Sequence, residues 1–306
     1  MYRLKTPLHK VAMVLTTLSE GVDISSASRI FGHHHSTISL WLERAGLHGA
    51  RLQERVFFQA ITAGHIQLDE LVTKVKLKAQ KLWVWTAITA KSKLIIAVHI
   101  GGRAIEDACL LFHQIQLALA PGCLPVFASD GLNQYFYGLT AHFGFWDKPP
   151  RAKKYHWFLD PGLQYAQLYK QRYGHKVRFL YSVIRLGTRK AIRAALEDLE
   201  LSGLIQTSFV ERSYLTFREL VASLSRRTWS LAYDTYHLWL HIQWGLTYYH
   251  FCRAHQSLEV RVRGPSKYRY RTPAMAAGLT RRRWSVAQIL LLPVPVEGWL
   301  QPFPVA

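Results

Sequence analysis

The sequence predicts an α/β protein in which a mixed β-sheet carries flanking helices and follows an all-α segment. Three strand-like runs rich in β-branched and aromatic residues follow one another over residues 65–100, separated by short turns. Beyond residue 103, helical spacing of apolar residues alternates with further strand-like runs, which is typical of a sheet covered by helices. With 49% hydrophobic and 19% charged residues in 306, the chain has the composition of a globular protein that buries a core.

The balance of charge points to a polyanionic partner. The chain carries 39 Lys+Arg against 19 Asp+Glu, a net charge of +20. Neutralising phosphates with Lys and Arg releases counterions, so nucleic acid is the first partner to consider. A membrane surface is the weaker alternative, because no long basic amphipathic segment stands apart from the core pattern.

Cysteine usage and apolar runs exclude several classes. Cys109, Cys123 and Cys252 are far apart and form no C-x-x-C pair, which argues against a zinc ribbon and a disulfide scaffold and fits a reducing compartment. The first ten residues lack the apolar core of a signal peptide, and the run 288–296 is short and broken by prolines. We therefore expect a soluble, cytoplasmic protein with no membrane partner.

The N-terminal region predicts a helix over residues 7–18 and a helix-turn-helix over 22–46. Ser28, Gly32, Ile38 and Trp41 have the spacing at which a small residue lets helices cross, glycine makes the turn and two apolar residues pack the second helix. A plain helical hairpin is the alternative. The side chains expected to reach DNA phosphates or base edges are those of His35, Ser36, Thr37, Ser39 and Arg44. The run of three histidines at 33–35 has no Cys or carboxylate partner at ligand spacing, so it is interpreted as surface rather than as a metal site.

The central region predicts a sheet. A connector over 48–64 leads to strands at 65–72, 82–90 and 93–100, which form an antiparallel meander with a Lys-rich turn at 74–81. The elements expected after it are a helix over 103–118, a strand over 125–130, helical and basic irregular segments over 132–176, a strand over 177–186 and a helix near 188–201. This order is that of a ribonuclease H-like fold.

The C-terminal third begins with one helix expected over Thr207–Thr228. Ser208 with Glu211 three residues later is a capping-box pattern, which places Glu211 in the first helical turn. An aromatic helix over 231–252 and a basic, proline-punctuated tail follow. The predicted domains are a helix-turn-helix domain over 1–55, a catalytic domain over 60–230 and a C-terminal helix and tail over 231–306.

Three carboxylates are candidates for a metal site. Asp69 lies in the middle of the first strand and Asp130 at the end of the fourth; in a ribonuclease H-like sheet these strands are adjacent, so the acids would need a cation between them. With Glu211 as a third ligand, such a set suits Mg²⁺, and two ions about 3.5–4 Å apart would support phosphoryl transfer. The alternatives are that Glu211 only caps its helix and that Asp130 belongs to an ordinary S-D-G turn. Glu70 is expected to face away from Asp69, toward solvent or a supporting position.

Five ordered segments resemble the DDE transposases of bacterial insertion sequences of the insertion-sequence-one type. They are QLDELV…WVWTAI, ASDGLNQY, TSFVERSYLTFRELVASLSRRT, YYHFCRAHQSL and RTPAMAAGLTRRRWS. The resemblance covers the chain from the helix-turn-helix onward. The chain departs from the family at Val72, Tyr214 and His250, where the family usually has Trp, Asn and Asn. The zinc-binding segment that often precedes the family's helix-turn-helix is expected to be absent.

The resemblance implies a ribonuclease H-like catalytic domain that cleaves and rejoins DNA at transposon ends with Mg²⁺ or Mn²⁺, Asp69, Asp130 and Glu211 being the metal-binding acids. Terminal inverted repeats and target DNA would be the double-stranded partners of a homo-oligomer at the bacterial nucleoid. Lys and Arg of 148–154, 170–193 and 261–283 are expected to grip the DNA backbone, and further candidates for DNA contact are Arg212, Arg218, Arg226 and Arg227. Two alternatives stay open: a decayed or domesticated copy that binds DNA without cutting it, and a nuclease that cuts without joining.

Overall fold

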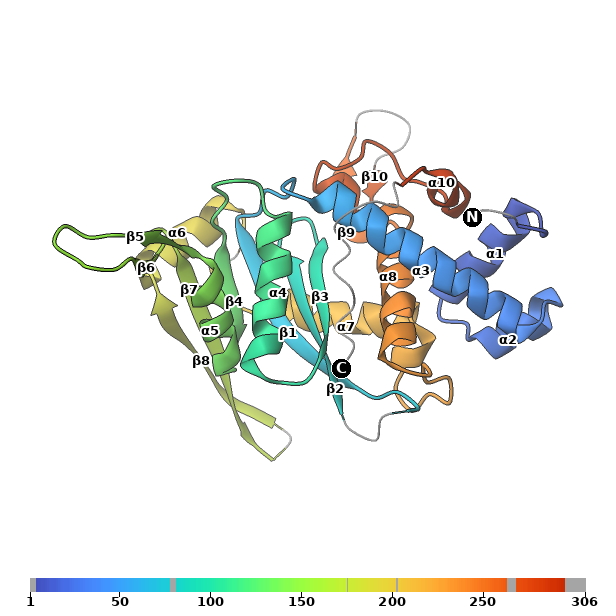
Figure 1. Ribbon diagram of the computed structural model, residues 1–306, viewed down its shortest axis with the longest axis horizontal. Helices are drawn as coiled ribbons and strands as arrows, with labels where there is room; N and C mark the ends of the chain where they lie inside the picture. The colour runs from blue at the N-terminus through green and yellow to red at the C-terminus, as the bar shows by residue number, and fades with distance from the viewer. Residues whose placement is uncertain (1–3, 78–80, 175, 202, 263–267, 295–306) are drawn as a thin grey trace. The chain divides into compact units, whose positions relative to one another are not determined.

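The computed structural model describes residues 4–77, 81–174, 176–201, 203–262 and 268–294 (Figure 1). The chain divides into two compact units. One contains Phe58–Val72 and Trp83–Arg212; the other contains Met1–Phe57, Thr73–Leu82 and Ser213–Ala306. One unit thus contains both N-terminal and C-terminal residues. Residues 78–80 of the predicted Lys-rich turn and 263–267 of the basic tail lie outside the described residues.

A six-stranded mixed sheet forms the centre of the first unit. Its strand order is β3-β2-β1-β4-β7-β8. The pairs β1–β4 and β4–β7 are parallel, whereas β2–β3 and β7–β8 are antiparallel. The predicted mixed sheet is therefore confirmed, and its order is compatible with a ribonuclease H-like fold. The strands are β1 (His65–Thr73), β2 (Leu82–Thr89), β3 (Ile95–Gly101), β4 (Val126–Asp130), β7 (Gln164–Tyr173) and β8 (Lys176–Leu186).

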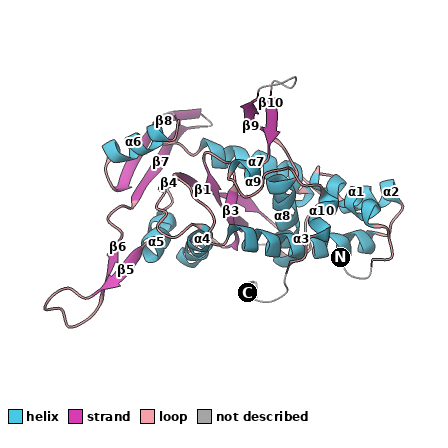
Figure 2. Cartoon of the chain, turned by 90° about the horizontal axis from the view of Figure 1, so that it is seen from above, coloured by secondary structure: helices cyan, strands magenta, loops and turns pink. Residues whose placement is uncertain are grey.

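Helices cover both faces of this sheet, as predicted. α4 (Ile105–Ala118) and α5 (Asn133–His142) lie on one face, and α6 (Arg189–Asp198) lies on the other (Figure 2). α4 buries one stripe of residues at helical spacing, namely Ala108, Leu111, Phe112 and Ile115. On the opposite face, Ile192 and Leu196, one helical turn apart, pack against side chains of β4 and β7.

The stretch 132–176 was wrongly predicted as helical and irregular. It contains α5, the short antiparallel pair β5 (Gly144–Asp147) and β6 (His156–Leu159), and β7, which is a strand of the central sheet. The strand pattern of β7 is masked by its polar residues. Gln167 is fully buried there, and its side-chain amide donates to the backbone carbonyl of Leu132 at 2.9 Å.

The second unit is mainly helical. α3 does not end near residue 46 but runs through the predicted connector to Phe57, because Gly46 and Gly49 are sites of close packing against α8 rather than helix ends. A Cβ on Gly49 would lie 3.1 Å from the Cβ of Thr247. The unit also contains a two-stranded β9–β10 sheet. Its elements are α1 (Leu8–Ser19), α2 (Ile24–Phe31), α3 (His35–Phe57), α8 (Thr235–Phe251), β9 (His255–Arg261), β10 (Tyr268–Arg271), α9 (Pro273–Ala276) and α10 (Val286–Leu291).

Helix α7 is shorter than predicted. It spans Ser208–Leu220, and the chain leaves it at Val221, whose extended backbone (φ −125°, ψ 99°) precedes a 3₁₀ turn, Ala222–Leu224. The predicted capping by Ser208 is also wrong: Ser208 donates to the side chain of Gln206, whereas the Thr207 hydroxyl donates to the Glu211 carboxylate at 2.6 Å. No helix in the described ranges combines the length and the apolar character needed to cross a bilayer.

Candidate metal centre

The parallel register of β1 and β4 brings two acids together. The paired residues run from His65 with Val126 to Leu68 with Ser129. The next residue on each strand is an acid, Asp69 on β1 and Asp130 at the carboxyl end of β4. The predicted adjacency of these two carboxylates is confirmed.

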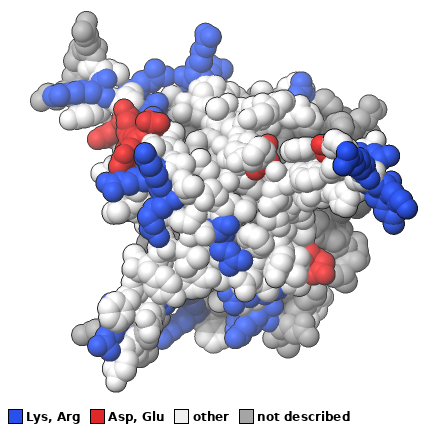
Figure 3. Space-filling view, turned by 90° about the vertical axis from the view of Figure 1, so that its left-hand side faces the viewer, with Lys and Arg blue, Asp and Glu red and all other residues white. Residues whose placement is uncertain are grey.

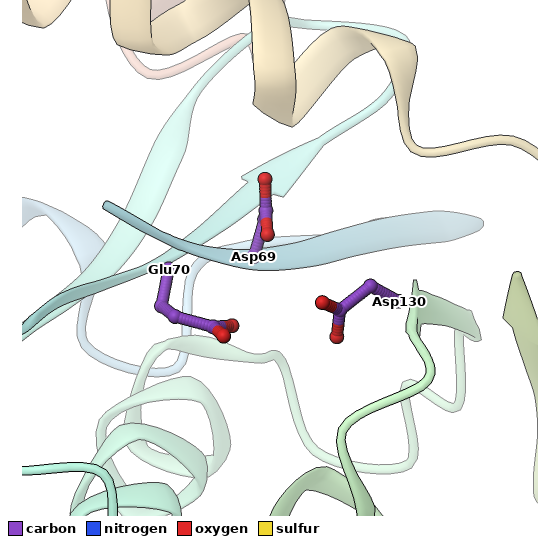
Figure 4. A group of neighbouring side chains, drawn as sticks. All are labelled: Asp69, Glu70 and Asp130. Atoms are coloured by element: carbon purple, nitrogen blue, oxygen red, sulfur yellow. The ribbon is translucent and has the colours of Figure 1, made fainter. Parts of the chain in front are cut away.

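Glu70 joins this pair (Figure 4). One carboxyl oxygen from each of Asp69, Glu70 and Asp130 lies within 4.8 Å of the other two. Asp69 and Glu70 leave β1 on opposite sides, as alternation requires, and the Glu70 side chain extends toward Asp130. Of the two expected positions for Glu70, the solvent-facing one is wrong, because its side chain is only 3% exposed.

Two residues from the following segments hold the Glu70 carboxylate. Arg103 donates from Nε to Glu70 Oε1 at 3.0 Å and forms an ion pair with it, and the Tyr135 hydroxyl donates to Oε2 at 2.9 Å. The Arg103 guanidinium also lies over the Trp83 ring, 4.5 Å from its centroid. Glu70 is thus partly neutralised by the protein itself, which leaves Asp69 and Asp130 as the acids with the greater need for a cation.

The electrostatics of the cluster favour cation binding. Burial, the charge of Glu70 and then that of Asp130 raise the pKa of Asp69 from 3.8 to about 8. Burial also raises the pKa of Asp130, although a backbone hydrogen bond from Leu132 and the charges of Arg103 and Lys170 act in the opposite direction. Buried carboxylates crowded in this way disfavour one another's charged forms, and a bound cation would relieve the repulsion.

Glu211 lies near the cluster without joining it. Its carboxylate forms an ion pair with Lys170 of β7 and accepts the hydrogen bond from Thr207. Its charge nevertheless contributes to raising the pKa of both Asp69 and Asp130. In the sheet, Leu168 of β7 is paired with Asp130 in β4, so Lys170 follows that pair by two residues.

The residues present fit a metal ion. Asp69, Glu70 and Asp130 offer carboxylate oxygens in one place, and such a group can hold a metal ion. Of the three predicted ligands, the structure brings two together and holds the third, Glu211, in an ion pair. Sequence reasoning missed Glu70 because only its long-range partners reveal that it is buried.

No protein-family model matches the chain. No curated protein matches it either.

The N-terminal helices α2 and α3 form a connected pair in the second unit. Gly32 joins them in the left-handed conformation (φ 67°), and Ile38 and Trp41 are buried, as their spacing predicts. The Ser28 hydroxyl donates to the backbone carbonyl of His33 at 2.6 Å, which braces the turn. Of the side chains predicted to reach DNA, the exposed ones are His35, Ser36 and Arg44, and the partly exposed ones are Thr37 and Ser39.

The four arginines predicted to contact DNA are exposed or partly exposed, and the three residues that differ from the resembled family range from exposed to fully buried. Arg212, Arg226 and Arg227 are exposed, and Arg218 is partly exposed. Val72 is also exposed and Tyr214 is buried. His250 is fully buried on α8 with its Nδ1 2.8 Å from Gln53 Oε1, and burial lowers its pKa to about 3, so it serves as a neutral packing and hydrogen-bonding residue between α3 and α8.

Proposed function

We propose that this chain is a metal-dependent DNA transposase of the DDE type. It would bind transposon-end DNA, hydrolyse a phosphodiester there and join the freed 3′-OH to target DNA. The observation that carries the proposal is the side-by-side placement of Asp69 and Asp130 on parallel strands, with Glu211 close by, in a chain of net charge +20. The ordered sequence segments that resemble insertion-sequence-one transposases support the same reading.

Asp69 and Asp130 would hold Mg²⁺, or Mn²⁺ in its place, with two ions per site and Glu211 as a further ligand. When bound, such a pair of ions supplies Lewis-acid chemistry that activates the attacking oxygen and stabilises the leaving oxygen of an in-line displacement. The same chemistry serves hydrolysis and strand transfer, since only the attacking hydroxyl differs.

The residues of the chain would position the acids and the DNA. Strands β1 and β4 hold Asp69 and Asp130 in register, and Arg103 with Tyr135 fixes Glu70 beside them. Lys170 is a cation next to the acids that could contact a phosphate once Glu211 is released from it. The α2–α3 pair would act as a helix-turn-helix on the terminal repeats, in the bacterial cytoplasm at the nucleoid, and the handling of two ends together predicts a dimer or larger assembly.

The test compares the wild type with Asp130→Asn and Glu211→Gln on a duplex of the element's own flanking DNA with Mg²⁺ or Mn²⁺. We expect the wild type to nick and join at the terminal repeat, and both variants to bind the duplex normally but react at least about a hundredfold more slowly, since each lacks a charged ligand. Asp198→Asn, an exposed carboxylate at the end of α6, is the matched control and should behave as wild type. Equal reaction rates for the wild type and Asp130→Asn would contradict the proposal.

A DNA-binding regulator that no longer cuts is the second candidate. The Lys170–Glu211 ion pair favours this regulator, because Lys170 engages the carboxylate that was predicted to be the third metal ligand. The regulator would bind the terminal-repeat duplex but release no product under any metal condition. A nuclease that cuts without joining would be distinguished by the lack of a strand-transfer product on supercoiled target DNA.

A further inference from the structure

A short two-stranded arm projects from the unit that contains the central sheet (Figure 1, left). This β5–β6 arm, residues 144–159, pairs Phe145 with Phe158 and Trp146 with Trp157, and the segment 148–155 links its strands. Trp157 anchors it, because its indole nitrogen donates to the backbone carbonyl of Thr140 on α5 at 2.8 Å.

The arm exposes several aromatic rings. Trp146 and Tyr155 are each 66% exposed and Phe145 is 47% exposed. The rings of Phe145 and Phe158 stack on each other, with centroids 6.1 Å apart and planes at 29°. An isolated exposed apolar residue needs no explanation, but a group of rings on one projecting arm indicates a surface that contacts a partner.

Cations lie at the end of the same arm. Lys148, Arg151, Lys153 and Lys154 are all exposed, and Asp147 is the only carboxylate between residues 144 and 159. The structure shows no ion pair for these four cations within its described ranges. Figure 3 shows Lys and Arg side chains gathered on the projection at its right-hand edge. The partner of the arm is therefore expected to carry negative charge as well as flat apolar faces.

We propose that the β5–β6 arm is a binding surface for unpaired nucleotides of DNA. Trp146 and Tyr155 would stack on bases, and the four cations would contact the intervening phosphates. Unpaired nucleotides fit better than a duplex, because the base faces inside a duplex are already stacked on their neighbours. The choice of DNA as the polymer rests on the proposed function; the stacking surface itself rests on the exposed rings.

Along the chain, α5 separates the arm from the acidic cluster. Asp130 precedes the first residue of α5, and the arm begins at Gly144, just after its last residue. Ten helical residues at 1.5 Å each span about 15 Å. That is about four to five nucleotides of one strand at 3.4 Å per nucleotide. On the proposed function, a single strand opened next to the cleavage point would thus span the length of α5 within about four to five nucleotides.

The experiment measures the affinity of the full chain for a labelled 20-nucleotide single strand and for a duplex of the same sequence, by fluorescence anisotropy with Mg²⁺ omitted. The ring variant is Trp146→Ala with Tyr155→Ala, and the charge variant is Lys153→Gln with Lys154→Gln. Trp229→Ala, which removes an exposed tryptophan outside the arm, is the control. Far-UV circular dichroism checks that each variant is folded.

We expect the ring variant to lose about tenfold or more in single-strand affinity and less than about twofold in duplex affinity. The charge variant should bind both the single strand and the duplex more weakly, and its affinity should depend less on the salt concentration. Unchanged single-strand affinity, or an equal loss in the ring variant and in Trp229→Ala, overturns the proposal. The proposal is also overturned if the rings serve another partner in place of the single strand. Such a result would be sedimentation with anionic phosphatidylglycerol vesicles, or dimerisation, that is lost in the ring variant.

The same variants separate this proposal from the proposed function. If Asp130→Asn abolishes cleavage while the ring variant keeps its single-strand affinity, the transposase reading stands and the arm proposal falls. If no metal-dependent cleavage occurs but single-strand binding depends on the rings, the arm proposal stands and the transposase reading falls.

Discussion

Lys170 on β7 and Glu211 in the first turn of α7 form an ion pair beside the acidic cluster. Thr207 donates a hydrogen bond to the same carboxylate. A cation that used Glu211 as a ligand would have to compete with the Lys170 ammonium for it. The pair therefore opposes metal binding in the free protein.

Substitution of Lys170 by Met should tighten metal binding. With the competing ammonium removed, the affinity for Mn²⁺ should rise by about two- to fivefold, the range expected for a partly exposed ion pair. Titration followed by electron paramagnetic resonance of free Mn²⁺ measures it. Lys91→Met, which breaks the exposed Lys91–Glu200 pair, is the control and should leave the affinity unchanged. Weaker Mn²⁺ binding by Lys170→Met would show that Lys170 supports the site instead.

The pH dependence of stability should report the raised pKa of Asp69. As pH rises from about 4 to 8, the unfolded chain loses the Asp69 proton first while the folded chain retains it, so deprotonation opposes folding. The free energy of unfolding of the metal-free protein should thus fall across this window by roughly 1–3 kcal/mol more than in Asp69→Asn. Urea unfolding with EDTA at pH 5 and pH 8 measures the difference. Parallel pH profiles for the two proteins would rule out this role of Asp69.

Removal of Arg103 should destabilise the protein through Glu70. Arg103→Ala leaves the buried Glu70 carboxylate without its cation, at a cost of about 2–4 kcal/mol. Glu70→Gln in the same chain should recover part of that loss, because it removes the uncompensated charge. Chemical denaturation of the single and double variants measures both effects. Arg193→Ala, which breaks the exposed Arg193–Glu197 pair, should cost less than about 0.5 kcal/mol; a similar loss for both arginines would contradict the prediction.

Gly46→Ala should destabilise the second unit although alanine favours helices. An added Cβ would lie 2.9 Å from the Leu240 carbonyl carbon and would overlap its oxygen, so α3 and α8 would have to separate. We expect a net loss of about 1–2 kcal/mol after the gain in helix propensity of up to about 1 kcal/mol. Thermal unfolding measures it, with Arg44→Ala on the exposed side of α3 as control. An increase in melting temperature would show that the two helices adjust without cost.

The parts of the fold that were predictable from sequence are those whose local pattern agrees with their environment. The runs at β1, β2, β3 and β4 are rich in apolar and aromatic residues and are buried in the sheet. Their order alone placed Asp69 next to Asp130. By contrast, β7 contains the fully buried Gln167, whose partners Leu132 and Arg185 lie 35 and 18 residues away, so its local pattern does not indicate a strand.

Partners that are distant in sequence also explain why the burial of Glu70 and the C-terminal extent of α3 were not predicted. The partners that bury Glu70 are Arg103 and Tyr135, 33 and 65 residues away, and strand alternation alone cannot reveal them. Gly46 and Gly49 lie where the predicted helix-turn-helix gives way to the predicted connector, and glycine weakens an isolated helix. Their role becomes clear only when α8, nearly two hundred residues later, packs against them.

The parallel pairing of β1 with β4 has a consequence for protein synthesis. Asp69 and Asp130 are about sixty residues apart in the chain, and α4 and two hairpin strands must be made before β4 can pair with β1. Contacts of such long range form late in folding. A ribosome-bound chain that ends before residue 130 would therefore carry no acidic pair. A translation product truncated before residue 130 would therefore lack the acidic cluster, even if its N-terminal helices still bound a partner.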